Sequence, residues 1–125
     1  MKLLKSQDTA GQSDAHVLTV DNTVDVLTLD LAGVQRVDLQ FPKFADGRAF
    51  SQAVMLRRRC GYTGTLRATG DVLVDQLQQM QRCGFDEAVL RDDQNTAVGE
   101  RLLALFPAFY QGDVLHAQPH FASAA

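Results

Sequence analysis

The sequence predicts an α/β fold: a small parallel sheet made of repeated βα units, with helices packed on it. Two observations lead to this prediction: a helix-to-strand joint that occurs twice, and short apolar segments that alternate with stretches of helical periodicity. Strands that alternate with helices form βαβ units, whose right-handed crossovers give a parallel sheet. Four such units would form a small open sheet or half of a barrel, because a complete (β/α)₈ barrel typically needs about 250 residues.

The repeated joint lies in the middle of the chain. Residues 59–62 read Arg-Cys-Gly-Tyr, and residues 82–85 read Arg-Cys-Gly-Phe. A glycine just after a helix adopts the left-handed conformation without a Cβ penalty, and the following aromatic can fold back on the last turn. Each copy therefore predicts a helix end followed by a short strand. Cys60 and Cys83 occupy equivalent positions, so we interpret them as two reduced thiols rather than a disulfide framework.

Three amphipathic helices and four strands follow from the flanking patterns. The strands are predicted at residues 16–20, 37–41, 65–68 and 87–90, each bounded by Gly, Pro or Asp. Apolar residues at helical spacing mark the helices. They are Ala49, Ala53, Leu56 and Cys60; Leu73, Leu77, Met80 and Cys83; and Val98, Leu102, Leu105 and Phe109. Between the first two strands, Asp21 could cap a short helix through Leu31, although the alternation at residues 24–28 also permits a strand.

One domain is expected, over residues 16–110, preceded by an N-terminal arm (1–15) and followed by a flexible tail (111–125) that lacks periodicity. In the tail, His116 and His120 would need a helix to bind a metal together, and Pro119 counts against one. No metal site is therefore predicted. A homodimer that covers an exposed sheet edge is plausible.

The net charge and the hydropathy of the chain exclude two classes of partner, nucleic acid and membranes. A formal net charge of -3 and a pI near 5.4 argue against nucleic acid, which needs a basic face. The arginine run at residues 57–59 is interpreted as a solvated helix end. No apolar run approaches the roughly 20 residues of a membrane span, and the N-terminus lacks a long apolar core for export. We therefore expect a cytoplasmic protein that binds neither nucleic acid nor membrane.

The candidate site lies where the predicted strands end. In parallel α/β folds, ligands bind outside the carboxyl ends of the strands. Three loops qualify, at residues 42–51, 67–71 and 91–95, and each combines an arginine with an aspartate. Guanidinium groups beside a helix N-terminus suit a small oxyanion such as sulfate, sulfite, phosphate or a carboxylate. The predicted ligand-binding residues are Asp46, Gly47, Arg48, Ser51, Arg67, Gly70, Asp71 and Gln76.

A purely structural interpretation of these loops stands beside the functional one. Asp46 and Asp71 could cap helices, the glycines could turn the chain, and the arginines could pair with the aspartates. Catalysis is left open in the same way. Asp46, Asp71 and Asp75 are the candidates for moving protons, but the chain contains no G-x-G-x-x-G, P-loop, C-x-x-C or G-x-S-x-G motif. No cofactor is identified, and whether the chain is an enzyme stays open.

Three separated motifs resemble those of the bacterial domain-of-unknown-function 934 family. They are FPKFADGRAFS at 41–51, LRATGDVLVDQ at 66–76 and RCGFD at 82–86, in order and with matching spacing. The resemblance covers roughly residues 16–111, and the tail beyond it has no counterpart that we can place. The family's L-R-E-R pattern is altered here, because Arg58 replaces its acid.

This resemblance implies a role in sulfur assimilation. Family members are commonly described as probable oxidoreductases of sulfite reduction, because their genes lie beside assimilatory sulfite reductase. The leading hypothesis is an accessory protein of sulfate and sulfite reduction that binds a small oxyanion or the reductase through the strand-end loops. The alternatives are an oxidoreductase that uses a flavin or nicotinamide at the same face, and a non-catalytic structural partner of the reductase or of its electron donor.

Overall fold

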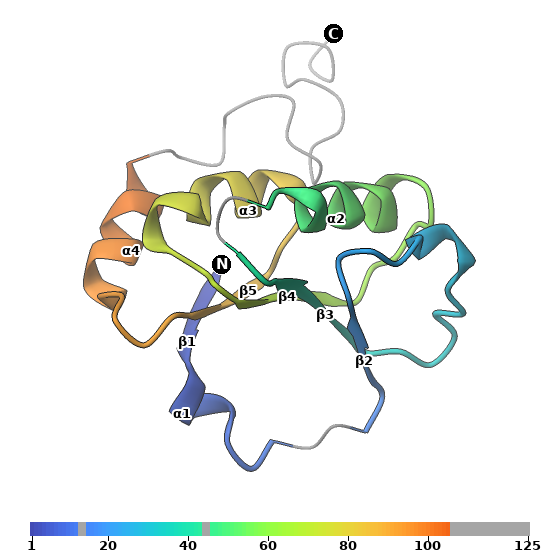
Figure 1. The fold of residues 1–125 in the computed structure, drawn as a ribbon, viewed down its shortest axis with the longest axis horizontal. Coiled ribbons are helices and arrows are strands. Elements are labelled where there is room, and N and C mark those ends of the chain that lie inside the picture. The colour runs from blue at the N-terminus through green and yellow to red at the C-terminus, as the bar shows by residue number, and fades with distance from the viewer. Residues whose placement is uncertain (13–14, 44–45, 106–125) are drawn as a thin grey trace, which may run out of the picture.

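The computed structural model describes residues 1–12, 15–43 and 46–105, and these form a five-stranded parallel sheet with helices packed against it (Figure 1). The sheet order is β1-β5-β4-β3-β2. The strands are β1 (Lys2–Lys5), β2 (Val17–Val20), β3 (Arg36–Phe41), β4 (Thr65–Gly70) and β5 (Glu87–Leu90). The predicted α/β class is confirmed, and the sheet is open rather than closed into a barrel.

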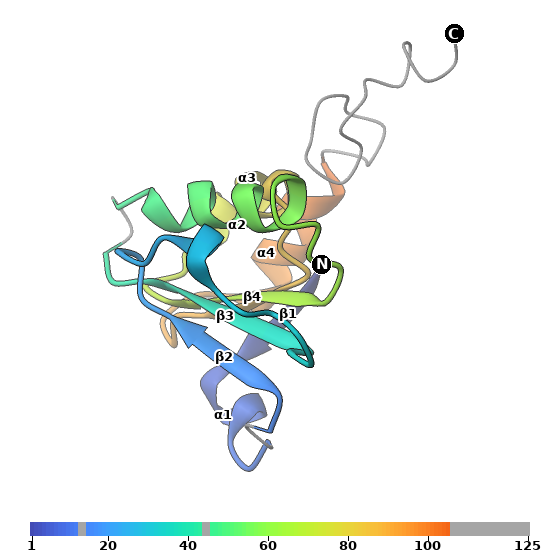
Figure 2. The same cartoon turned by 90° about the vertical axis from the view of Figure 1, so that its right-hand side faces the viewer.

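The first strand was not expected. Residues 2–5 of the predicted N-terminal arm form β1, which pairs in parallel with β5 at one edge of the sheet. A single helical turn, α1 (Ser6–Thr9), follows and leads the chain under the sheet (Figures 1 and 2). The arm therefore contributes a strand to the domain instead of preceding it.

The segment after β2 differs from the predicted helix. Only one 3-10 turn forms there, η1 (Val26–Thr28), and Asp25 rather than Asp21 caps it by accepting from the Leu27 N–H at 3.0 Å. The Asp21 carboxylate instead accepts from the backbone N–H of Thr23 at 2.8 Å. Such local side-chain bonds compete with helix formation, so the predicted helix from Asp21 to Leu31, and its strand alternative, are both wrong.

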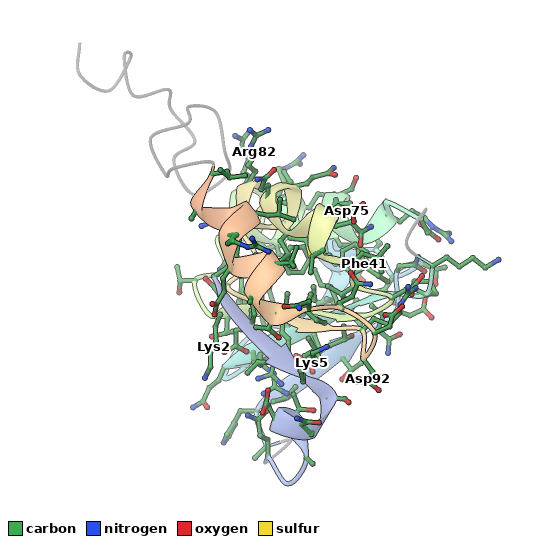
Figure 3. The ribbon with its side chains drawn as sticks, turned by 90° about the vertical axis from the view of Figure 1, so that its left-hand side faces the viewer. Lys2, Lys5, Phe41, Asp75, Arg82 and Asp92 are labelled. Atoms are coloured by element: carbon green, nitrogen blue, oxygen red, sulfur yellow. The ribbon has the colours of Figure 1, made fainter. Side chains whose placement is uncertain are left out.

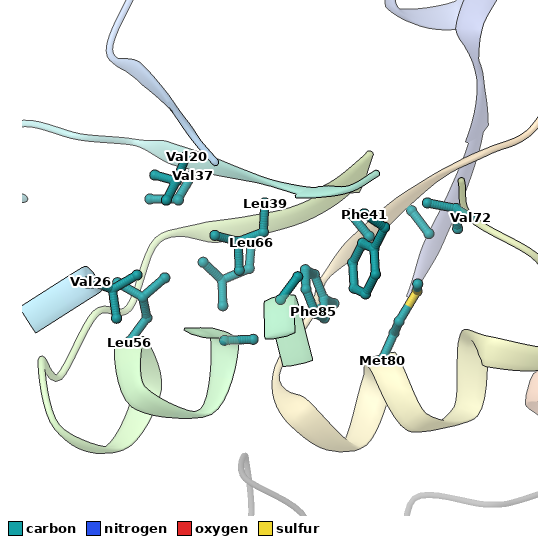
Figure 4. Packing of buried hydrophobic residues seen from close by; sticks show 14 of the residues in the cluster. Val20, Val26, Val37, Leu39, Phe41, Leu56, Leu66, Val72, Met80 and Phe85 are labelled. Carbon is teal, nitrogen blue, oxygen red and sulfur yellow. The ribbon is translucent and has the colours of Figure 1, made fainter. Parts of the chain in front are cut away.

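Three helices cover one face of the sheet (Figure 2). They are α2 (Arg48–Arg58), α3 (Leu77–Cys83) and α4 (Thr96–Ala104), and a 3-10 turn, η2 (Val74–Gln76), precedes α3. On the sheet side, alternate residues of β3, Val37, Leu39 and Phe41, are fully buried. Figure 4 shows them facing Leu56 of α2 and Met80 of α3. All three predicted helices are present, but Cys60 lies beyond the end of α2, and Leu73 lies before η2 and α3.

The two copies of the repeat form the joints that the sequence predicts. Gly84 adopts φ 107°, and the N–H of Phe85 returns to the carbonyl of Met80 at 3.1 Å. In the first copy, the N–H of Tyr62 returns to the carbonyl of Leu56 at 2.9 Å. Both cysteines are free thiols, as predicted.

Arg57 ties the two joints together. Its Nη1 donates to the carbonyls of Tyr62 and Gly64 at 2.8 Å, and its Nη2 donates to Gly84 O at 2.8 Å and to Asp86 Oδ2 at 2.7 Å. Its side chain is 9% exposed. The prediction of a solvated arginine run is therefore wrong at Arg57, because unpaired carbonyls of both joints converge there, whereas Arg58 beside it is exposed.

Candidate functional site

The carboxyl ends of the strands bring together most of the charged residues that the sequence singled out. We call this region the strand-end edge. Figure 3 shows Asp75, Phe41 at the end of β3 and Asp92 on the same side of the molecule. The edge consists of Lys5, Asp21, Asn22, Lys43, Asp46, Arg48, Asp71, Asp75, Arg91, Asp92 and Asp93.

Asp46 and Arg48 form the first cluster, at the N-terminus of α2. Arg48 binds the Asp46 carboxylate with two nitrogens, Nε to Oδ1 at 3.1 Å and Nη2 to Oδ2 at 2.8 Å. The same carboxylate accepts from the Arg48 backbone N–H at 3.1 Å and from Asn22 Nδ2 at 2.9 Å. Asp46 therefore occupies both the guanidinium fork and a free N–H at the helix start, the two features expected to bind an oxyanion.

Arg91 organises the second cluster, at the ends of β4 and β5. Its Nε and Nη2 bind the two oxygens of Asp93 at 2.7 and 2.8 Å, and its Nη1 binds Asp71 Oδ1 at 2.7 Å. All three nitrogens of this guanidinium are thus engaged by carboxylates. The pairing that the structural interpretation foresaw is present in both clusters.

Lys5 at the end of β1 fixes the loop that carries Arg91. Its Nζ donates to the carbonyls of Arg91 at 3.2 Å, Asp92 at 3.1 Å and Gln94. No sequence pattern indicates this role, because Lys5 lies in the segment interpreted as an arm. Asn22 was missed for a similar reason, since the wrong helix prediction hid its place at the end of β2.

The other predicted ligand-binding residues do not join the two clusters of arginine and aspartate, and they do not form a site with one another. Arg67 is the third residue of β4, not part of a strand-end loop, and its carbon-rich stem and guanidinium are buried on the sheet. Ser51 is exposed one turn into α2, beside the apolar side chains Phe50 and Val54. Gln76 accepts from the Leu73 N–H at 3.1 Å and so caps η2. The prediction that Arg67 belongs to the strand-end face is wrong, because β4 continues through Gly70.

Gly70 has a structural reason to be glycine. Its φ is 97°, and a Cβ at this position would lie 2.5 Å from the carbonyl oxygen of Phe41. The adjacent Asp71 N–H donates to that same oxygen at 2.7 Å. The turn after β4 therefore presses against the end of β3 and positions Asp71 next to Arg91.

The ion pairs hold the carboxylates of Asp46 and Asp93 ionised. The hydrogen bonds from the Arg48 side chain and backbone, together with Asn22, place the pKa of Asp46 far below its usual range. The Arg91 guanidinium, with Gln94, lowers the pKa of Asp93 to about 2. Carboxylates with such low pKa values are poor proton carriers near neutral pH, because the best general acid or base has a pKa close to the working pH. The geometry therefore does not favour Asp46 as a catalytic acid or base.

The Cys83 thiol is not activated either. Burial raises the pKa of Cys83, which opposes formation of a thiolate. Among residues 1–12, 15–43 and 46–105, no three His, Cys, Asp or Glu side chains come close enough together to hold a metal ion. In the same residues, no helix has the length and apolar character needed to cross a membrane. His116 and His120 lie outside the described residues, as does the predicted tail.

The edge carries more carboxylates than cations. Its acidic members are Asp21, Asp46, Asp71, Asp75, Asp92 and Asp93, and its basic members are Lys5, Lys43, Arg48 and Arg91. Because each arginine is already neutralised by an aspartate, the remaining field is negative. Chemically, this arrangement suits contact with a basic group better than capture of a free anion.

Comparison with known proteins gives the family. Neither curated proteins nor solved structures produced a match. The sequence model of a protein family described as "Bacterial protein of unknown function (DUF934)" matches residues 15–121. The match begins after β1 and α1, and it extends ten residues beyond the resemblance noted from the motifs, so part of the tail has a counterpart after all. The chain belongs to the bacterial domain-of-unknown-function 934 family.

Proposed function

We propose that this chain is a cytoplasmic accessory protein of assimilatory sulfite reduction, which docks on the sulfite reductase through the strand-end edge. The resemblance to proteins whose genes lie beside that reductase supports the pathway. The ion pairing at the edge is the single observation that carries the proposal, because it favours a protein partner over a free oxyanion.

A free oxyanion would compete with the aspartates of the edge for the same arginines, and for this reason we favour a protein partner. A free sulfite or sulfate would have to displace Asp93 from Arg91, whose three nitrogens are all occupied, or Asp46 from Arg48. Each displacement would leave a carboxylate facing the bound anion. A partner protein meets no such cost, because basic side chains on its surface would interact with the exposed carboxylates Asp75 and Asp92. The small-oxyanion form of the hypothesis is therefore second to docking.

Charge reversal on the edge tests the proposal. Asp75→Lys changes an exposed carboxylate in η2, and Glu100→Lys makes the same change at an exposed position of α4. Rim charges mainly affect the association rate and the salt dependence of binding. We expect the Asp75 variant to bind the sulfite reductase about tenfold more slowly at low salt, whereas the Glu100 variant binds like the wild type.

Surface plasmon resonance with the purified reductase measures these rates. Equal association rates for the wild type and both variants would contradict docking through this edge. Calorimetry of the wild type with sulfite and with sulfate provides the second arm. Saturable heat that Arg48→Gln abolishes would support the oxyanion form instead.

A further inference from the structure

Among residues 1–12, 15–43 and 46–105, no helix layer covers one face of the sheet, although parallel sheets normally have cover on both faces. Sheets made only of parallel strands are usually buried on both faces, but α2, α3 and α4 all pack on the same side here (Figures 1 and 2). On the opposite side, the described chain returns through α1 and the residues that lead into β2. We call this side the polar face. Its side chains include Arg36 and Asp38 of β3, Thr65 and Arg67 of β4, and Glu87 of β5.

Two arginines at the centre of the polar face are held by carboxylates. Arg36 binds Asp38 with Nε at 2.7 Å and Nη2 at 3.2 Å. Arg67 donates from Nε to Glu87 Oε1 at 2.8 Å and from Nη1 to Gln12 Oε1 at 3.0 Å. Arg67 is only 4% exposed, although a charged side chain is almost never buried so deeply without a specific partner. Arg67 is therefore a buried cation at a position in the sheet where an apolar residue would be expected.

Open space lies beside these pairs. A hollow of about 390 Å³ is bordered by Arg36, Thr65, Arg67 and Glu87, with His16 on its rim. A second hollow, of about 270 Å³, lies on the other side of the same two arginines and reaches Asp38 and Thr69. The larger one falls within the usual size of small-molecule sites, roughly 300 to 1,000 Å³.

Each charged group keeps unused hydrogen-bonding capacity. Within the described residues, Arg36 Nη1, Arg67 Nη2 and Glu87 Oε2 make no hydrogen bond. The hollow thus offers donors from two guanidinium groups and an acceptor from a carboxylate. The Thr65 hydroxyl, which also borders the hollow, can both donate and accept a hydrogen bond.

The net charge of this cluster indicates which class of ligand the hollow can bind. Two guanidinium groups face two carboxylates, Asp38 and Glu87, so the cluster is formally neutral. A simple anion would add an uncompensated negative charge beside these carboxylates. A small molecule that carries one carboxylate and one ammonium group would satisfy the free donors and the free acceptor together, and would leave the cluster neutral.

We propose that the larger hollow of the polar face binds a small zwitterion of the α-amino acid type. The ligand carboxylate accepts from the free corners of Arg36 and Arg67, and its ammonium group donates to Glu87 Oε2. The existing pairs hold both guanidinium groups in place before the ligand arrives, which reduces the entropy lost on binding. This site is separate from the strand-end edge and does not depend on the docking proposed there.

NMR titration of the full-length protein tests the site. Glycine, L-serine and L-glutamine sample different sizes of zwitterion. Acetate and methylammonium carry the same two charges on separate molecules. We expect at least one amino acid to shift the backbone amide signals of β3, β4 and β5 saturably at millimolar concentration, and we expect acetate, methylammonium and sulfate to leave them unchanged.

Two variants and a control locate the binding. Arg36→Gln removes one guanidinium and should weaken amino-acid binding by about tenfold or more. Thr65→Val tests the hollow without removing a charge, and should weaken binding less. Arg48→Gln breaks the equivalent Arg and Asp fork at the strand-end edge, so it should bind amino acids like the wild type.

Three results would overturn the proposal. The first is that no amino acid shifts these signals, and the second is that Arg36→Gln and Arg48→Gln bind alike. The third is binding of acetate or sulfate as tight as that of the amino acids, which would make the hollow a general anion site.

Discussion

The strand-end edge and the interior of the molecule use arginine in different ways. At the edge, the side chains of Arg48 and Arg91 are 61% and 41% exposed. In the interior, those of Arg57 and Arg67 are 9% and 5% exposed. All four bind carboxylates at similar distances, so geometry alone does not tell them apart. The difference in solvent exposure determines how much each pair contributes to the free energy of unfolding. Water screens the attraction in an exposed pair, whereas removing one partner of a buried pair leaves a charge that is shielded from water and unpaired.

This contrast predicts where substitutions will be felt. Interior arginines should be needed for the fold, whereas edge arginines should be free to serve a surface role. The following tests are ordered from the largest expected effect to the smallest.

Arg57→Met should destabilise the protein most. It removes the donors that join Tyr62 O, Gly64 O, Gly84 O and the Asp86 carboxylate, and leaves these acceptors partly unpaired. We expect a loss of about 3 kcal/mol in the free energy of unfolding, measured by urea denaturation.

Arg58→Met is the matched control for Arg57. Arg58 is the next residue in α2 and is exposed, so its replacement should change the free energy of unfolding by less than about 0.5 kcal/mol. Similar losses for the two variants would show that the joints do not rely on Arg57.

Arg67→Met should cost about 2 kcal/mol, because Glu87 and Gln12 lose their partner. This loss is smaller than for a fully buried pair, since the Glu87 side chain is 19% exposed. Thermal and urea unfolding measure the loss. The double variant Arg67→Met, Glu87→Met should recover much of it, because no charge is then left unpaired.

Arg48→Met provides the comparison from the edge. Its pair with Asp46 is exposed to solvent, so we expect no measurable shift of the urea midpoint. If Arg48→Met destabilised the protein as much as Arg67→Met, burial would not be what separates the two regions.

Next to the edge, the uncharged cap of α4 should matter for stability. The Asn95 side chain accepts from the N–H groups of Ala97 and Val98 at 2.9 and 3.2 Å, which caps α4. Asn95→Ala should lower the free energy of unfolding by about 1 kcal/mol, while Asn95→Asp should keep the cap. Loss of helix signal at a lower temperature in circular dichroism measures the change. An unchanged unfolding temperature for Asn95→Ala would refute the cap's contribution.

The smallest effect concerns acid. Arg91 lowers the pKa of Asp93 to about 2, from an ordinary value of 3.8. Because the folded-state pKa is depressed, the pair stabilises the fold above the ordinary pKa, and this contribution is lost as the pH falls through about 2. Carbon NMR titration of the Asp93 carboxyl should show the low midpoint, and Arg91→Met should return it toward the ordinary value. A wild-type midpoint near 3.8 would mean that the pair does not persist in solution.

The repeated joint made the fold predictable from the sequence. Its glycine and aromatic act locally, through φ and through contact with the preceding turn, so their effect is visible in a few consecutive residues. The edge strand β1 was not predictable in the same way. Residues 2–5 carry only two apolar side chains, and their strand conformation depends on pairing with β5, more than eighty residues away.

The site was predictable only in part. Asp46 with Arg48, and Asp71 with Arg91, were expected near each other because parallel strands end at one edge. Arg67 was misplaced because its strand runs two residues further than the apolar pattern suggests, through a polar threonine and a glycine that contacts β3. The roles of Lys5 and Asn22 depend on contacts between distant segments, which no local pattern reveals.

Hydrogen exchange with and without the sulfite reductase tests the central claim most directly. If the strand-end edge is the docking surface, the reductase should slow exchange at residues 21–23, 46–51 and 91–95, and leave the outer side of α4 unchanged. Protection of α4 or of the polar face, with no change at the strand-end edge, would contradict the account.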